Sequence, residues 1–287
     1  MKTADCILCR SDRGSTVHDL KDYSYVRCSG CGLVSLHPMP GRAALMEIYS
    51  GADERAVDPT TDPTGEESLF LARFGEELDR IEKHASRGRI LDIGSAWGFF
   101  LHVCRERGWD AWGVDPARVE SEYARRRFGL PIVTGTLADA RFPSESFDVV
   151  TLWHVLEHFP DPVTELGAIR RILKPSGLLV ISVPTAHSLK DFDYGPIPLH
   201  CWYFGQATLS ALVEREGFRV VRVVGAGGTG AVRTLKKLGV RNPAQTLVRH
   251  YRVLHWVRKA ARAVLNLAGP RKEITLYARA SAPGKGN

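Results

Sequence analysis

The sequence of 287 residues predicts an α/β fold built around a doubly wound, mainly parallel sheet. Two observations predict this fold. From residue 89 onward, short apolar runs that suit buried strands alternate with amphipathic helical stretches. In the first such unit, residues 89–115, a strand leads into a glycine-bearing turn, a helix and a second strand that ends in an acid. Because ligands of such sheets bind at the carboxyl ends of the strands, this unit also predicts a binding site.

The N-terminal segment, residues 1–40, contains two cysteine pairs. Cys6 and Cys9 form one C-x2-C pair, and Cys28 and Cys31 form the other. Four thiolates can occupy the corners of a tetrahedron, which is the geometry of a closed structural Zn²⁺ site with no position left for a catalytic water. The segment therefore predicts a zinc ribbon, the alternative being unpaired thiols in a disordered leader. Its nearly neutral formal charge argues against nucleic-acid binding.

Residues 41–87 are expected to form a linker and a helical lid. A short helix is predicted over 43–49, and residues 53–67 are rich in Asp, Pro and Thr, which is typical of a mobile linker or lid. Apolar residues at helical spacing over 66–84 then predict an amphipathic helix that leads to the first strand of the sheet.

The glycine turn indicates which kind of ligand the sheet binds. The turn reads Asp92-Ile93-Gly94-Ser95-Ala96-Trp97-Gly98. Gly94 and Gly98 let a ligand approach the backbone, and the helix from about Phe99 offers amide donors. The acid Asp92 would repel a pyrophosphate but suits a cationic ligand, and Asp115 can accept hydrogen bonds from both hydroxyls of a ribose. The turn thus predicts an adenosine-containing cofactor other than a dinucleotide, unless it is only the strand-to-helix turn of another doubly wound protein.

The remaining elements continue the alternation of strands and helices. Helix 163–173 is expected to stop at the proline and glycine of residues 174–177. The other predicted elements are helix 117–128, strand 131–135, strand 147–153, strand 178–183, helix 205–216, strand 218–224 and strand 273–280.

Five motifs in order make the resemblance to a known family specific. They are DIGSAWG, GVD, GTLADARFPSESFDVV, LWHVLEHFPDP and LKPSGLLVISVP. Together they resemble class I S-adenosylmethionine-dependent methyltransferases, namely the bacterial small-molecule family related to the ubiquinone-biosynthesis O-methyltransferases, a subset of which carries an N-terminal cysteine ribbon. The resemblance spans about residues 6–280. It implies a seven-stranded Rossmann-like sheet in a methyltransferase domain over 88–282, whose last two strands form an antiparallel hairpin interrupted by an insertion at 226–272.

The resemblance also implies a cofactor site. Gly94 and Gly98 would contact the methionine and ribose parts through the backbone, and Asp92 would order the turn or the ammonium group. Asp139 would accept from the adenine amino group, although family members usually carry the acid where Ala138 stands. The full implied set is Asp92, Gly94, Ser95, Gly98, Asp115, Leu137, Asp139 and Trp153. The chain departs from the family at Ala96, where the motif has a glycine.

Histidines beyond the predicted strands 147–153 and 178–183 are candidates for a general base. They are His154, His158, His187 and His200. A histidine of near-neutral pKa can take the proton from a hydroxyl, and we expect His154 or His200 to do so. Alternatively, Glu157 and His158 only fix their loop by hydrogen bonds. The chain lacks the Asn/Asp-Pro-Pro-Tyr motif typical of nucleobase or amide methylation, which favours an oxygen or carbon acceptor on a small molecule.

The net charge of +7 is unevenly distributed. Residues 219–272 contain 13 Lys and Arg and no Asp or Glu. Within them, 244–267 predicts a basic amphipathic helix that could lie on anionic lipid, cover the active site or pair with a second subunit; it could also be a solvated basic face over an ordinary core. The absence of acids favours an anionic partner, such as a phosphorylated or lipid-linked substrate or a membrane surface.

The sequence therefore predicts an S-adenosylmethionine-dependent methyltransferase with a structural Zn²⁺ and a small-molecule acceptor from secondary-metabolite, glycan or lipid biosynthesis. No segment has the length of a membrane span or the pattern of a signal peptide, so a cytoplasmic location is expected, with peripheral contact to the inner membrane surface through 244–267 as an option. One alternative is an RNA methyltransferase that uses the ribbon and the basic insertion. Another is a non-catalytic zinc-ribbon scaffold. The oligomeric state is left open.

Overall fold

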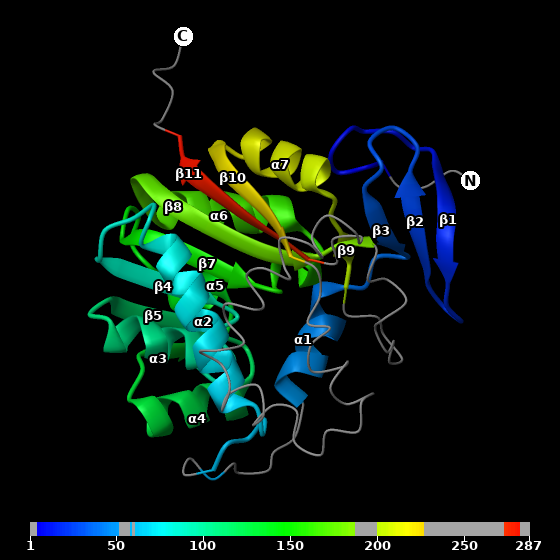
Figure 1. The fold of residues 1–287 in the computed structure, drawn as a ribbon. Helices are drawn as coiled ribbons and strands as arrows, with labels where there is room; N and C mark the ends of the chain where they lie inside the picture. Colours follow the sequence, from blue (N-terminus) through cyan, green and yellow to red (C-terminus); the bar gives the residue numbers. More distant parts are fainter. Residues whose placement is uncertain (1–4, 52–57, 59–60, 187–199, 227–272, 282–287) are drawn as a thin grey trace, which may run out of the picture.

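A computed structural model describes residues 5–51, 58, 61–186, 200–226 and 273–281. Its centre is a seven-stranded sheet with the strand order β10-β11-β8-β7-β4-β5-β6 (Figure 1). Strands β8, β7, β4, β5 and β6 are parallel, whereas β11 runs antiparallel to both β8 and β10. The strands are β4 (Arg89–Ile93), β5 (Asp110–Asp115), β6 (Ile132–Thr134), β7 (Phe147–Trp153), β8 (Leu173–Pro184), β10 (Phe218–Ala226) and β11 (Glu273–Ala280). This topology confirms the predicted seven-stranded α/β class and its antiparallel last hairpin.

Helices cover both faces of the sheet and enclose two apolar cores. One face carries α2 (Glu67–Ile81), α3 (Phe99–Glu106) and α4 (Arg118–Phe128). The other carries α5 (Leu137–Ala140), α6 (Pro162–Ile172) and α7 (Gln206–Arg215). The strands between them are buried on both sides, which is why they read as continuous apolar runs in the sequence.

Local signals in the sequence set the ends of several helices. Asp161 caps α6 by accepting from the backbone amides of Val163 and Thr164, and Pro162 takes the first helical position. At its C-terminus α4 ends on Gly129, whose φ of 63° is left-handed.

Helix α6 ends at Ile172, close to the predicted end, but residues 174–177 do not separate the helix from the next strand as predicted. They lie inside strand β8. Leu173 already pairs with Phe147, and Leu178 pairs with Val149, so the four residues between them form an irregular bulge. Full burial of Leu173 favours its extended conformation at the end of α6, and an ion pair of 2.8 Å between Lys174 Nζ and Asp148 Oδ2 fixes the bulge.

A second, four-stranded sheet joins the N-terminal ribbon to the large domain. It has the order β1-β2-β3-β9 and consists of β1 (Gly14–Asp19), β2 (Ser24–Cys28), β3 (Val34–His37) and β9 (Trp202–Tyr203). The first three strands come from the ribbon, whereas β9 follows β8 in the chain (Figure 1). Helix α1 (Arg42–Gly51) then leads from the ribbon toward α2.

Some predictions fall outside the described residues. All of the insertion at 226–272 except Ala226 does, as do the basic helix at 244–267 and His187. Among the helices that the structure describes, none has the length and apolar character needed to cross a membrane.

Candidate active site

The turn between β4 and α3 has a backbone that only glycine adopts easily. Gly94 and Gly98 have φ values of 74° and 76°, in the left-handed region. A Cβ at Gly94 would overlap Cγ2 of Val155, and one at Gly98 would lie 2.7 Å from Cβ of Ala124. Ala96 is also left-handed, with φ of 43°, although it carries a Cβ. The turn is therefore tightly packed. Ala96 stands where the family motif has a glycine, and it keeps the left-handed backbone that such a glycine would have.

Asp115, at the end of β5, ties this turn to the next helix. Its Oδ2 accepts from the amide of Ala96 at 2.7 Å, and its Oδ1 accepts from the amide of Ala117 at 2.8 Å. Burial raises the pKa of Asp115, and the two backbone hydrogen bonds oppose that shift. Since a carboxylate has about four acceptor positions, two remain for the hydroxyls of a ribose.

Asp92 and Ser95 are held within the turn. Asp92 is buried and accepts a hydrogen bond of 2.7 Å from Oγ1 of Thr151, and burial raises its pKa well above the ordinary value. The Oγ atom of Ser95 is buried beside Gly113 and has no hydrogen-bond partner within the described residues. Asp92 is thus tied to the neighbouring strand β7, and Ser95 leaves a buried polar atom in the turn.

The other residues expected at the cofactor also have structural contacts. Leu137 is buried in the core. Oδ2 of Asp139 accepts from the amide and the hydroxyl of Thr136, at 2.8 Å and 2.7 Å, in a capping box that begins α5. Trp153 packs on Phe74 and Phe100, and its buried Nε1 has no partner in the described part of the chain.

The turn and Asp115 fit an adenosine-containing cofactor. The backbone at Gly94 and Gly98 is bare, so a ligand can approach it closely, and the carboxylate of Asp115 lies at the end of the neighbouring strand. These are the residues that would hold S-adenosylmethionine.

His154 lies between two carboxylates just beyond β7. Its Nδ1 is 3.6 Å from Oε1 of Glu157, and its Nε2 is 3.4 Å from Oε1 of Glu273. The same oxygen of Glu273 accepts from Nη2 of Arg73 at 2.7 Å and from Oγ of Ser182 at 2.8 Å. Sequence patterns do not point to Arg73 or Glu273. The pairing of β11 with β8 brings Glu273 to His154, and Arg73 reaches Glu273 from helix α2.

A second group surrounds Glu157, which is completely buried. Neither of its carboxylate oxygens has a hydrogen-bond partner within the described residues. Nε2 of His158 lies 4.0 Å from Oε1, and the rings of His158 and His200 meet edge to face with their centroids 4.7 Å apart. One ligand atom from each of these three residues lies within 4.8 Å of the others, a donor set that could accept a divalent cation.

The two candidate bases have opposite protonation at neutral pH. Burial would lower the pKa of His154, but Glu157 and Glu273 outweigh it and raise that pKa to about 9. The pKa of Glu273 falls to about 2, because its contacts with His154 and Arg73 outweigh burial. Burial, assisted by the nearby His158, lowers the pKa of His200 to about 4. His154 is therefore a cation, and His200 is a neutral imidazole that can accept a proton.

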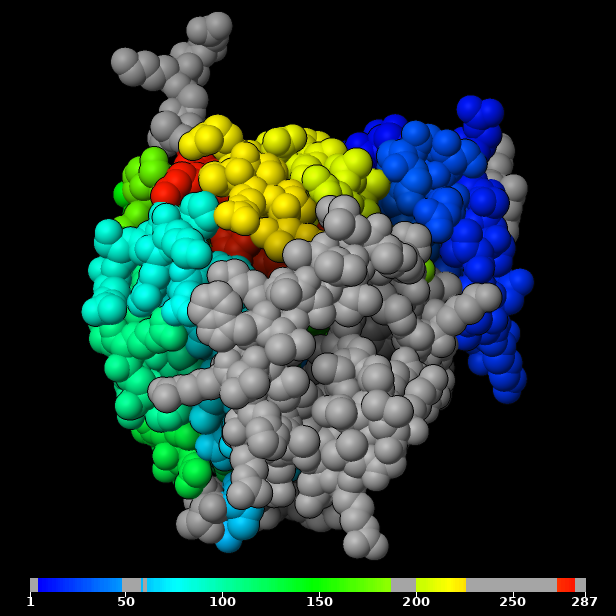
Figure 2. Space-filling view, in the orientation of Figure 1, coloured from blue at the N-terminus to red at the C-terminus, as the bar shows by residue number. Residues whose placement is uncertain are grey.

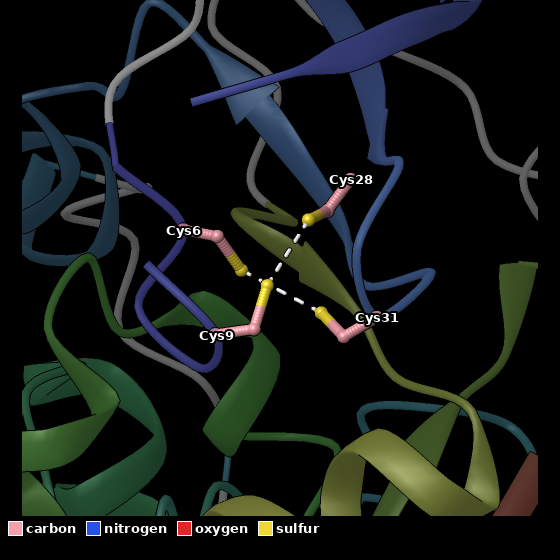
Figure 3. A group of neighbouring side chains, drawn as sticks. All are labelled: Cys6, Cys9, Cys28 and Cys31. Atoms are coloured by element: carbon pink, nitrogen blue, oxygen red, sulfur yellow. Dashed lines mark hydrogen bonds between the residues drawn. The ribbon is translucent and has the colours of Figure 1, made fainter. Parts of the chain in front are cut away.

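The four cysteines of the ribbon converge from two separate loops (Figure 3). The Sγ atoms of Cys6 and Cys31 are 3.6 Å apart, and those of Cys9 and Cys28 are 3.5 Å apart. A tetrahedron with Zn–S bonds of about 2.3 Å has edges of about 3.8 Å, so this arrangement fits Zn²⁺. Burial would raise the pKa of Cys28, but backbone amide hydrogen bonds outweigh it and lower the pKa to about 6, whereas burial raises the pKa of Cys6 and of Cys31. Metal binding would require all four thiols to lose their protons.

Comparison with known proteins agrees with this geometry. Residues 67–223, more than half of the chain, match the family model described as a methyltransferase domain. A probable S-adenosylmethionine-dependent methyltransferase of Mycolicibacterium smegmatis is 25% identical over 56% of this chain and 63% of its own length. A ubiquinone biosynthesis O-methyltransferase of Idiomarina loihiensis is 34% identical over 42% of this chain and 54% of its own length. The chain thus spans less than two thirds of these curated relatives.

Solved structures support the fold. A methyltransferase from Archaeoglobus fulgidus, described as SAM-dependent, aligns with a TM-score of 0.52 and 20% identity, over 74% of this chain and 94% of its own. A complex of the Haloferax volcanii Trm112 methyltransferase activator with a methyltransferase gives a TM-score of 0.52 and 17% identity, over 77% and 98% of the two chains. With its matched domain, glycine turn and sheet order, this chain belongs to the methyltransferase-domain family related to S-adenosylmethionine-dependent and ubiquinone-biosynthesis O-methyltransferases.

Proposed function

We propose that the chain transfers a methyl group from S-adenosylmethionine to a hydroxyl oxygen, or alternatively a carbon, of a small molecule. The observation that carries this proposal is the left-handed turn at Gly94, Ala96 and Gly98 tied to the buried carboxylate of Asp115. The proposal is supported by the family match and by relatives named as O-methyltransferases. The whole cofactor site would also include Asp92, Ser95, Leu137, Asp139 and Trp153.

The histidines suggest a division of labour in the reaction. When bound, the sulfonium of S-adenosylmethionine supplies an electrophilic methyl group for an in-line displacement. His200, neutral at neutral pH, accepts the proton of the acceptor hydroxyl, and the carboxylate of Glu157 stabilises the imidazolium that results. His154, a cation held by Glu157 and Glu273, stabilises negative charge on the acceptor.

The ribbon and the basic segment have separate proposed roles. Cys6, Cys9, Cys28 and Cys31 hold a structural Zn²⁺, supported by the spacing of their sulfur atoms. The acceptor carries negative charge or a lipid, or the chain contacts an anionic membrane surface, which is supported by the excess of Lys and Arg in residues 219–272. Its place of action is the cytoplasm, and binding to nucleic acid is expected to be weak.

Binding of S-adenosylhomocysteine to the full chain, measured by calorimetry, tests the cofactor assignment. Asp115→Asn should weaken binding by about tenfold, or 1.4 kcal/mol, since one acceptor for the ribose hydroxyls is lost. Asp110→Asn is the matched control, because Asp110 begins the same strand and bonds to Arg89 and Trp112 at its surface. It should bind like the wild type. Absence of binding to the wild type, or equal binding by Asp115→Asn, would overturn the proposal.

A further inference from the structure

The segment that carries His200 is part of the sheet of the ribbon. Strand β9 pairs with β3, with Val34 opposite Tyr203 and Ser35 opposite Trp202. The amide of Leu36 extends this pairing by donating to the carbonyl of Cys201 at 2.9 Å. Within the described residues β3 is the strand partner of β9, so the ribbon fixes the backbone that follows His200.

The other side of the same segment contacts the loop that bears Glu157. The amide of Cys201 donates to the carbonyl of Glu157 at 2.8 Å, and Nε1 of Trp202 donates to the carbonyl of Phe159 at 2.8 Å. Residues 200–204 therefore lie between the ribbon and the loop that bears Glu157, and hydrogen bonds connect them to both.

Two buried tyrosines reach His200 itself. Tyr25, in β2, and Tyr203, in β9, are 0% and 1% exposed, and their rings meet edge to face at 5.2 Å. The hydroxyl of Tyr25 donates to the carbonyl of His200 at 2.8 Å. The hydroxyl of Tyr203 is 3.1 Å from Nδ1 of the same histidine. One tyrosine thus holds the backbone of His200 and the other holds its ring in one orientation, with the hydroxyl of Tyr203 as donor or acceptor at Nδ1 according to the tautomer.

We propose that Tyr25 and Tyr203 are positioning residues for His200, so that the ribbon forms one wall of the active site. This inference rests on the proposed role of His200 in accepting a proton. The cysteine cluster is part of the same wall, because β2 ends at Cys28 and β3 begins three residues after Cys31. The ribbon also contacts α7, where Nη1 of Arg215 donates to the carbonyl of Ile7, and the two regions adjoin on the surface (Figure 2).

Histidine ring signals of the full chain test this inference without a known methyl acceptor. In protein labelled with ¹⁵N-histidine, and with His200 assigned through His200→Gln, the ring nitrogens report the tautomer directly. Tyr203→Phe removes the hydrogen bond at Nδ1 and should change the ratio of the two neutral tautomers of His200, and Tyr25→Phe should shift or broaden its signals. Tyr23→Phe is the matched control, because Tyr23 packs against the same apolar cluster of the ribbon, whereas the hydroxyls that contact His200 are those of Tyr25 and Tyr203. It should leave His200 unchanged.

Removal of bound Zn²⁺ by a chelator provides a second measurement that needs no substitution. It should displace the signals of His200 and leave those of His102, which stacks on Phe128 in the remote core, in place. Unchanged His200 signals in both tyrosine variants, or after Zn²⁺ removal, would overturn the inference. Affinity for S-adenosylhomocysteine should stay within about twofold in the three tyrosine variants. Failure of the wild type to bind it would instead overturn the proposed function.

Discussion

Gly94→Ala should damage the cofactor turn in two separable ways. The left-handed backbone, with φ of 74°, should cost an alanine about 1–2 kcal/mol. The new Cβ would overlap Cγ2 of Val155, and overpacking of this kind costs about 1–3 kcal/mol. We therefore expect the free energy of unfolding to fall by about 2–5 kcal/mol.

A double-mutant cycle with Val155→Ala separates the two contributions. Removing both γ methyl groups of Val155 relieves the overlap but not the backbone strain, so the cycle should show a coupling free energy of about 1–3 kcal/mol. Urea unfolding followed by circular dichroism gives the stabilities. Affinity for S-adenosylhomocysteine should fall in Gly94→Ala and recover in part in the double variant.

Gly108 supplies the control for backbone strain alone. Its φ is 84°, and a Cβ there would meet no atom within 4 Å. Gly108→Ala should therefore lose only about 1–2 kcal/mol and keep its affinity for S-adenosylhomocysteine. If Gly94→Ala is no less stable than Gly108→Ala, or if the effects of Gly94→Ala and Val155→Ala simply add, the packing argument is refuted.

Three further predictions concern other parts of the chain. Ala96→Gly should relieve about 1–2 kcal/mol of left-handed strain and lose about 0.5–1 kcal/mol to the entropy of the unfolded chain, a net gain of about 0–1.5 kcal/mol. Calorimetry should therefore show a Tm that is equal to that of the wild type or higher by up to about 6 °C, and a lower Tm would contradict the strain at Ala96. Because the pKa of His154 is raised to about 9 in the folded state, protonated His154 stabilises the fold. This contribution is fully present below pH 6.5 and is lost as the pH rises through about 9. Urea midpoints should therefore fall over this range more in the wild type than in His154→Gln, and parallel curves would contradict it. Cys28→Ser should lower the bound Zn²⁺ found by metal analysis, because a tetrahedral site loses one of its thiolates; full retention of Zn²⁺ would count against the proposed site.

The strands and helices of the large sheet could be predicted because their signals are local. Continuous apolar runs identify β4, β7 and β8, and Asp161 with Pro162 marks the start of α6. The cysteine pairs could be found for the same reason, since their spacing is short. The first residues of β8, 173–177, were not predicted as part of the strand. A nearby proline and glycine usually mark a turn, but here the burial of Leu173 outweighs that tendency.

The charged surroundings of His154 could not be predicted from the sequence. Arg73 and Glu273 are 200 positions apart and meet only through the packing of α2 and β11 at the end of the sheet. Strand β9 has two residues, too few to show any periodicity, and its partner lies in the ribbon. The family motifs identify residues along the chain, but they carry no information on which distant charged side chains lie close enough to form ion pairs.

The antiparallel sheet of the ribbon, which β9 completes, has a consequence for how a nascent chain matures. Tyr25 must wait until the ribosome has added 175 further residues before the carbonyl of His200 exists. Until then the ribbon presents β3 as an open edge, the kind of edge to which strands of other chains attach. Early capture of a metal ion could order the loops around the cysteines but could not close that edge. The interval between synthesis of β3 and of β9 is thus a period in which the ribbon carries an unpaired strand edge.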